Sequence, residues 1–122
     1  MIDHVVLGVH HLGESRHFYE HALAPLGLKV VRDDDPDLVG FGDESGKPFF
    51  WLARREPSHR VHVAFTAPDR ASVDAFHAAA LHFGGVDNGP PGLRLHYHDD
   101  YYAAFAYDGD GNNIEAVCHQ PE

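Results

Sequence analysis

Three residues of the 122-residue chain, His4, His62 and Glu115, have side chains that could hold a metal ion together. Glu115 stands within an apolar segment, residues 114–117, directly after the acidic turn at residues 108–111. An ionised carboxylate is costly to bury without a partner, and a metal ion is one such partner. Two histidines and a carboxylate suit a divalent first-row metal and leave positions open for substrate and water. The sequence therefore predicts a metal site if the fold brings these three side chains together.

An internal repeat gives a reason why they should meet. Residues 4–7 (His-Val-Val-Leu) align with residues 62–65 (His-Val-Ala-Phe) at an offset of 58 residues (62 − 4). Further on, Trp51 corresponds to Glu115 at an offset of 64 (115 − 51), because the second half has a longer loop at residues 87–99. A repeat of this length indicates two copies of one structural module. If the copies pack with pseudo-twofold symmetry, their first and last strands can line a shared cleft.

The two modules, residues 1 to about 57 and about 58 to 122, lie in one domain and share an order of elements. In the first, the spacing of apolar residues predicts a strand, a helix and three more strands at 2–9, 12–23, 28–32, 38–42 and 49–53. In the second, it predicts a strand at 61–67, a helix at 70–83 capped by Asp69, and strands near Val86, at 101–107 and at 113–118. We expect a turn at 33–36, a loop at 88–92 and extended chain at 93–97. The predicted fold class is α+β, with two βαβββ modules.

Composition limits the classes of partner. The formal net charge of −10 disfavours nucleic acid and anionic membranes, since both attract basic surfaces. No apolar run approaches the length of a membrane span, and we expect no export signal, because residues 1–4 contain no basic segment followed by an apolar one. The single cysteine, Cys118, cannot form an internal disulfide, so a reducing cytoplasm is the expected location. A small molecule is the expected ligand.

The pattern resembles the vicinal oxygen chelate superfamily, which includes glyoxalase I, extradiol dioxygenases, and the fosfomycin and bleomycin resistance proteins. The residues that carry the resemblance lie at 3–9, 15–19, 62–65 and 108–115. The resemblance implies paired βαβββ modules that form a cupped mixed sheet around a metal. It also implies a homodimer, often with modules exchanged between chains.

Each branch of that superfamily has a marker that this chain lacks. Glyoxalase I has a fourth ligand, a glutamate, where this chain has Trp51. Fosfomycin resistance proteins have a threonine where this chain has Val6, and several cationic groups where it offers only Arg94. Extradiol dioxygenases have a tyrosine and a proline at the positions of Phe105 and Gly109. Bleomycin-binding members usually lack the metal ligands that this chain keeps.

The resulting hypothesis is a glyoxalase-like lyase or isomerase that acts on a small oxygenated substrate chelated to Zn, Ni, Mn or Fe. An extradiol-type dioxygenase and a non-catalytic binder of a drug such as bleomycin are the alternatives, and a fosfomycin-modifying transferase fits less well. His98 and Tyr101 are the candidates for proton transfer, since histidine titrates near neutral pH and tyrosine donates a hydrogen bond. The candidate pocket residues are Trp51, Phe50, Phe105 and His96.

Overall fold

The computed structural model describes residues 1–57 and 60–122, and it confirms the βαβββ order in both halves. The first module comprises β1 (Val5–Val9), α1 (Leu12–Leu23), the short 3-10 helix η1 (Ala24–Leu26), β2 (Lys29–Asp35), β3 (Leu38–Gly42) and β4 (Pro48–Arg54). The second comprises β5 (His62–Thr66), α2 (Arg70–His82), β6 (Val86–Leu93), β7 (Tyr102–Tyr107) and β8 (Asn113–Cys118).

Each module forms its own four-stranded mixed sheet. The strand orders are β1-β4-β3-β2 and β5-β8-β7-β6. In both sheets the first and last strands of the module run parallel, and the remaining pairs are antiparallel. Val6 pairs with Trp51 in the first sheet, and Ala64 pairs with Glu115 in the second. These pairs have the same offsets, 58 and 64, that the sequence repeat predicts.

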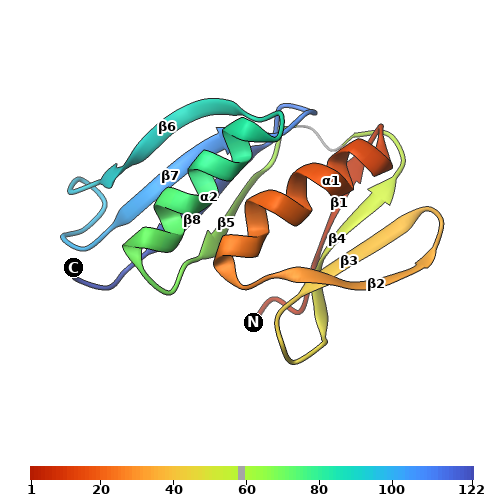
Figure 1. Ribbon diagram of the computed structural model, residues 1–122, viewed down its shortest axis with the longest axis horizontal. Helices are drawn as coiled ribbons and strands as arrows, with labels where there is room; N and C mark the ends of the chain where they lie inside the picture. Colours follow the sequence, from red (N-terminus) through yellow and green to blue (C-terminus); the bar gives the residue numbers. More distant parts are fainter. Residues whose placement is uncertain (58–59) are drawn as a thin grey trace.

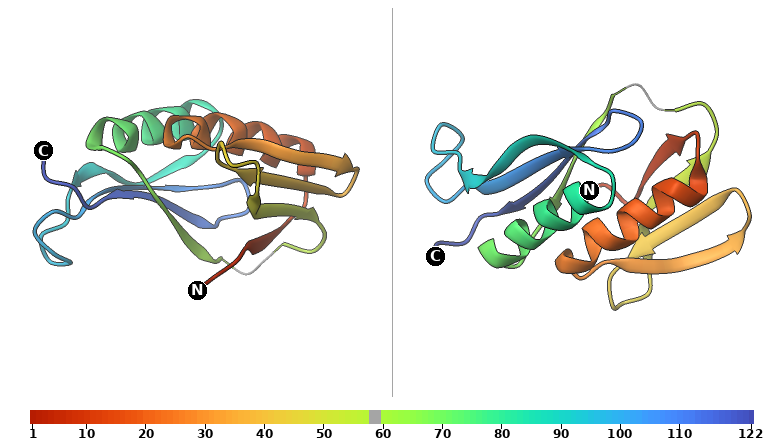
Figure 2. Two further views of the ribbon diagram at one scale, coloured as in Figure 1. Left: turned by 90° about the horizontal axis from the view of Figure 1, so that it is seen from below. Right: turned by 45° about the horizontal axis from the view of Figure 1, so that its top comes forward.

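Both helices lie on the same side of the two sheets (Figures 1 and 2). α1 and α2 lie side by side, and the opposite faces of the sheets carry no helix. The hydrophobic core fills the space between helices and sheets, where side chains such as Leu7, Tyr19, Phe76 and Ile114 are almost fully buried. None of the described helices is long and apolar enough to cross a membrane.

Local signals explain where the helices begin and end. The carboxylate of Asp69 accepts a hydrogen bond from the backbone N–H of Ser72 at 2.7 Å, which confirms the predicted cap of α2. The α1–η1 segment ends at Gly27, whose φ of 83° is a left-handed conformation that glycine adopts without strain.

Three of the expected boundaries are wrong. β6 continues through residues 88–92, because it is the edge strand of its sheet and its two prolines fall within a register shift between Gly89 and Gly92. Its pairing with β7 is irregular, with register shifts on either side of Gly89. β2 likewise continues to Asp35, so the turn is shorter than expected. Residues 95–97 form a turn instead of extended chain, and Tyr97 N–H donates to the carbonyl of Arg94 at 2.9 Å.

Candidate metal-binding and catalytic site

Glu115 lies on the helix-free face of the second sheet. Its neighbours along β8, Ile114 and Ala116, point into the core, so the carboxylate projects to the other side. Despite this position, the Glu115 side chain is only 2% exposed. A carboxylate at such a position needs partners, and two side chains provide them.

His62 is the first partner. Its Nε2 donates to Oε1 of Glu115 at 2.7 Å, while half of the imidazole, 52%, stays exposed. The two residues come together because β5 and β8 are parallel neighbours and Glu115 pairs with Ala64, two residues after His62. Phe105 on β7 is the other register partner of Glu115, and its ring centroid lies 6.1 Å from that of His62. Phe105 thus forms an apolar wall beside the pair.

Tyr101 is the second partner. Its hydroxyl donates to Oε2 of Glu115, so both carboxylate oxygens are engaged. Burial, and then this hydrogen bond, raise the pKa of Tyr101 above its ordinary value of 10.0. The phenol is therefore protonated at neutral pH and serves as a hydrogen-bond donor to Glu115. His98 packs edge-on against Tyr101, with ring centroids 5.1 Å apart.

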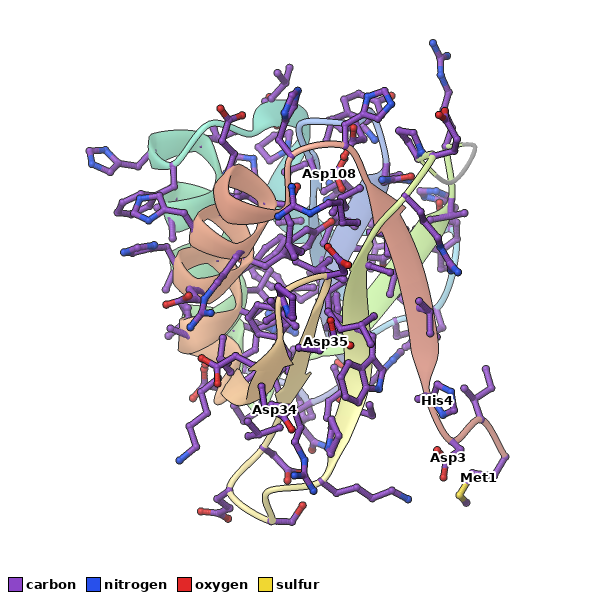
Figure 3. The ribbon with its side chains drawn as sticks, turned by 90° about the vertical axis from the view of Figure 1, so that its right-hand side faces the viewer. Met1, Asp3, His4, Asp34, Asp35 and Asp108 are labelled. Carbon is purple, nitrogen blue, oxygen red and sulfur yellow. The ribbon has the colours of Figure 1, made fainter. Side chains whose placement is uncertain are left out.

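His4 does not join this group within the chain. Its Nδ1 hydrogen bonds with Asp3 at 2.7 Å, and both side chains are at least half exposed. Figure 3 shows His4 and Asp3 together near the N-terminal end of β1, at the opposite end of that view from Asp108. Among the described residues, no three histidine, cysteine or acidic side chains are grouped closely enough to hold an ion. One chain therefore brings together two of the three predicted ligands.

Two of the predicted pocket residues, Trp51 and Phe50, lie on opposite sides of the first sheet. Trp51 lies on the open face of the first sheet, where it lines a hollow with His4 and Val6. Phe50 points to the other side, is 1% exposed and packs against Tyr19 and other core rings. Phe50 is therefore part of the core.

His96 lies on the loop between β6 and β7. Its ring is exposed and contacts that of Tyr97 at a centroid distance of 4.2 Å. The structure shows no contact between His96 and the His62–Glu115 pair.

Hydrogen bonds to the buried carboxylate of Asp108 stabilise the acidic turn before β8. Asp108 is buried, and its Oδ1 accepts the backbone N–H groups of Asp110 and Asn112, each at 2.9 Å. Its Oδ2 accepts the hydroxyl of Tyr19 at 2.5 Å. Because Tyr19 belongs to α1, this bond joins the two modules just upstream of Glu115. It has no signal in the sequence, since the two residues are 89 positions apart.

Two further residues make contacts near the site that the sequence analysis did not predict. A ring nitrogen of His119 lies 2.9 Å from Nε2 of His98, so one donates a hydrogen bond to the other. Strand alternation from Glu115 through 117 to 119 could have placed His119 on the open face. The guanidinium of Arg94 lies over the ring of Phe105 at 5.4 Å, and it donates to backbone carbonyls of β6. The position of Arg94 over Phe105 depends on the irregular pairing of β6 with β7, which the spacing of apolar residues in the sequence does not predict.

Known proteins share this architecture over the whole chain. The family model described as the glyoxalase/bleomycin resistance protein/dioxygenase superfamily matches residues 1–116. A glyoxalase/bleomycin resistance protein from Albidiferax ferrireducens is 30% identical with a TM-score of 0.82, and the match covers 99% of each chain. No curated protein matches the chain.

Two more distant structures support the fold alone. A lactoylglutathione lyase from Agrobacterium tumefaciens is 20% identical with a TM-score of 0.69, covering 97% of this chain and 92% of its own. A glyoxalase/bleomycin resistance protein/dioxygenase family enzyme from Burkholderia phytofirmans is 16% identical with a TM-score of 0.73. That match covers 97% of this chain and 98% of the other. From the family match, together with the paired βαβββ modules, we conclude that the chain belongs to the glyoxalase/bleomycin resistance protein/dioxygenase superfamily.

Proposed function

We propose that this protein is a metal-dependent, glyoxalase-like lyase or isomerase that acts on a small oxygenated substrate. In this proposal His62 and Glu115 of one chain bind a divalent ion together with His4 of a second copy. The observation that carries the proposal is the buried carboxylate of Glu115 on an open sheet face, with an exposed imidazole 2.7 Å away. Two oxygens and one nitrogen at one point are donors that suit Zn, Ni, Mn or Fe.

The homodimer in this proposal follows from the position of His4. The residue occupies the same place in the first module that His62 occupies in the second, but its ring is exposed, and among the described residues its hydrogen-bond partner is Asp3. The face around it is apolar, with Val6 38% exposed beside Trp51 and Leu38. A second copy that covers this face with its own second module would supply His62 and Glu115 and bury the apolar side chains.

The other residues then have defined tasks. A divalent ion at these ligands would act as a Lewis acid toward neighbouring oxygens of the substrate. Tyr101 orients the carboxylate of Glu115 through its hydroxyl. His98, exposed and in contact with Tyr101, is the group placed to exchange a proton with solvent. Phe105, and Trp51 of the second copy, provide apolar walls for the carbon part of the substrate.

The direct test is metal binding by the purified protein. The chain is stripped with a chelator, reloaded separately with Zn²⁺, Ni²⁺, Mn²⁺ or Fe²⁺, and its bound metal is measured by mass spectrometry. We expect His62→Ala and the isosteric Glu115→Gln to lose the ion, whereas His96→Ala, an exposed histidine of the same module, should retain it. At a ligand concentration a hundred times Kd, binding should also stabilise the fold by about 2.7 kcal/mol.

Three results would contradict the proposal. If none of the four ions binds or stabilises the protein, the enzyme hypothesis fails, and non-catalytic binding of a drug or metabolite remains. If metal binds but the protein consumes O₂ with catechols, the reaction is oxygenation and not a lyase or isomerase step. A metal content equal to that of the wild type in both His62→Ala and Glu115→Gln would show that these two residues do not hold the catalytic ion.

A further inference from the structure

A pair of histidines on α1 lies outside the candidate site. His17 and His21 are four residues apart, so they lie one above the other on the same face of the helix. Two histidines at this spacing on a helix can bind one zinc ion. We propose that His17 and His21 form a second, independent binding site for a divalent transition metal such as Ni²⁺, Zn²⁺ or Cu²⁺.

The separation of the two rings fits a shared ion. At a metal–nitrogen distance of about 2.0–2.1 Å, two imidazoles bound side by side to one ion have ring centroids roughly 4.5–5 Å apart. The centroids of His17 and His21 are 4.5 Å apart, with the ring planes at 57°. The spacing of the two rings is therefore compatible with one shared ion.

The hydrogen bond of His21 prepares that ring for coordination. Its Nδ1 lies 2.8 Å from the backbone carbonyl of His17, and because a carbonyl only accepts, Nδ1 must carry the proton. In the neutral imidazole, Nε2 then has a free lone pair. Metal-binding histidines usually donate their other ring N–H in this way, which fixes both the tautomer and the ring orientation.

The ring of Phe83, directly after α2, contacts both histidine rings. Its ring stacks on that of His21 at a centroid distance of 3.8 Å and an angle of 19°, and it meets the ring of His17 edge-on at 5.5 Å. A ring that is already held in place loses less conformational entropy when it binds a ligand. Because Phe83 follows the C-terminal end of α2, the positions of the two histidine rings depend on the packing of α1 against α2.

Glu20 limits what such a site could do. In metal-dependent hydrolases with two helical histidines, an adjacent glutamate serves as the base. Here Oε1 of Glu20 accepts a hydrogen bond from Nε of Arg16 at 2.6 Å, so its carboxylate is engaged by a permanent cation. The site therefore binds metal without hydrolytic activity. With two protein ligands and water in the other positions, its affinity should be lower than that of a three-ligand centre.

The experiment separates this site from the proposed catalytic centre. In a chain carrying His62→Ala and Glu115→Gln, calorimetric titration with Ni²⁺ should still show one equivalent, bound at the helical pair. Adding His17→Gln and His21→Gln should abolish that equivalent, and His21→Gln alone should weaken it at least tenfold. His82→Ala is the matched control, because His82 also contacts Phe83 but lies on α2, and it should leave binding unchanged.

Ring NMR signals give a second measurement that does not depend on total binding. On addition of Zn²⁺, the signals of His17 and His21 should shift together while that of His82 stays in place. The proposal is overturned if the equivalent survives in the His17→Gln/His21→Gln chain, or if the His62→Ala/Glu115→Gln chain binds no Ni²⁺. Failure of the catalytic proposal would look different, because the wild-type and His62→Ala/Glu115→Gln chains would then bind equal amounts.

Discussion

Tyr19→Phe tests the bond that joins the two modules next to the candidate site. The substitution removes only the hydroxyl, which is fully buried and donates to Oδ2 of Asp108 at 2.5 Å. The aromatic ring stays, so its packing against Phe50, at a centroid distance of 5.2 Å, should be preserved. The variant therefore measures the hydrogen bond without a change in buried apolar area.

The size of the effect follows from the partners that Asp108 keeps. Its Oδ2 still accepts the side-chain amide of Asn112 at 2.9 Å, and Oδ1 keeps two backbone donors. Asp108 thus loses one donor but is not left unpaired. A buried hydrogen bond to a charged group contributes about 1.5–3 kcal/mol, so we expect Tyr19→Phe to cost about 2 kcal/mol of unfolding free energy.

Urea unfolding at a fixed protein concentration, followed by circular dichroism, is the assay. Tyr102→Phe is the matched control, because it also removes a hydroxyl that binds a carboxylate, that of Asp74 at 2.6 Å, but at an exposed position. We expect the control to cost less than about 1 kcal/mol. Equal losses in Tyr19→Phe and Tyr102→Phe would refute the claim that burial makes the Asp108 bond the stronger one.

Three further predictions concern the core, the open face and a helix cap. Phe50→Ala should cost about 3–5 kcal/mol in urea unfolding, because it empties a nearly fully buried site. Trp51→Ala should cost clearly less, and a cost equal to that of Phe50→Ala would show that Trp51 is buried as deeply as Phe50. Asp69→Ala should lower the melting temperature by removing the acceptor for Ser72. The Ser72 side chain, and then its backbone N–H, lower the pKa of Asp69 below 3.8, so the ionised cap stabilises the folded state above that pH. This stabilisation is lost as the pH falls through the pKa of Asp69 in the folded state. The difference in melting temperature between the wild type and Asp69→Ala should therefore become smaller below pH 3.8. A difference that stays constant with pH would show that the charge of Asp69 does not stabilise the helix.

The repeat made much of the fold predictable. Aligning two copies of one module predicted the same order of elements in both halves. The structure adds the equivalent strand register, with Trp51 opposite Val6 and Glu115 opposite Ala64. The contact between His62 and Glu115 follows from this register. Local pattern was sufficient for the order of elements, because turn residues mark most of the connections between them.

Some features were not predicted because they depend on contacts between residues far apart in the sequence. Others were missed because a strand has apolar side chains on both of its faces. In the run of residues 49–52 every side chain is apolar, so alternation could not tell that Phe50 faces the core and Trp51 the open side. The prolines of β6 signalled a loop, and only its position at the sheet edge allows a strand there. The place of His4 relative to His62 depends on how two modules pack, which no local pattern determines.

The central claim, that one chain's His62 and Glu115 share a metal with the His4 of a second copy, has a direct test in mixed dimers. A His4→Ala chain and a Glu115→Gln chain, each carrying a different tag, are produced together, and the heterodimer is isolated through both tags. If the ligands come from two chains, one of its two sites has all three native ligands and the other lacks two. With His17 and His21 replaced by glutamine in every chain, so that only the catalytic centre is counted, the heterodimer should then bind about half the metal of the dimer with native His4 and Glu115, while each variant alone binds none. A heterodimer as empty as its parents would contradict the claim, because it would show that each site takes its three ligands from a single chain.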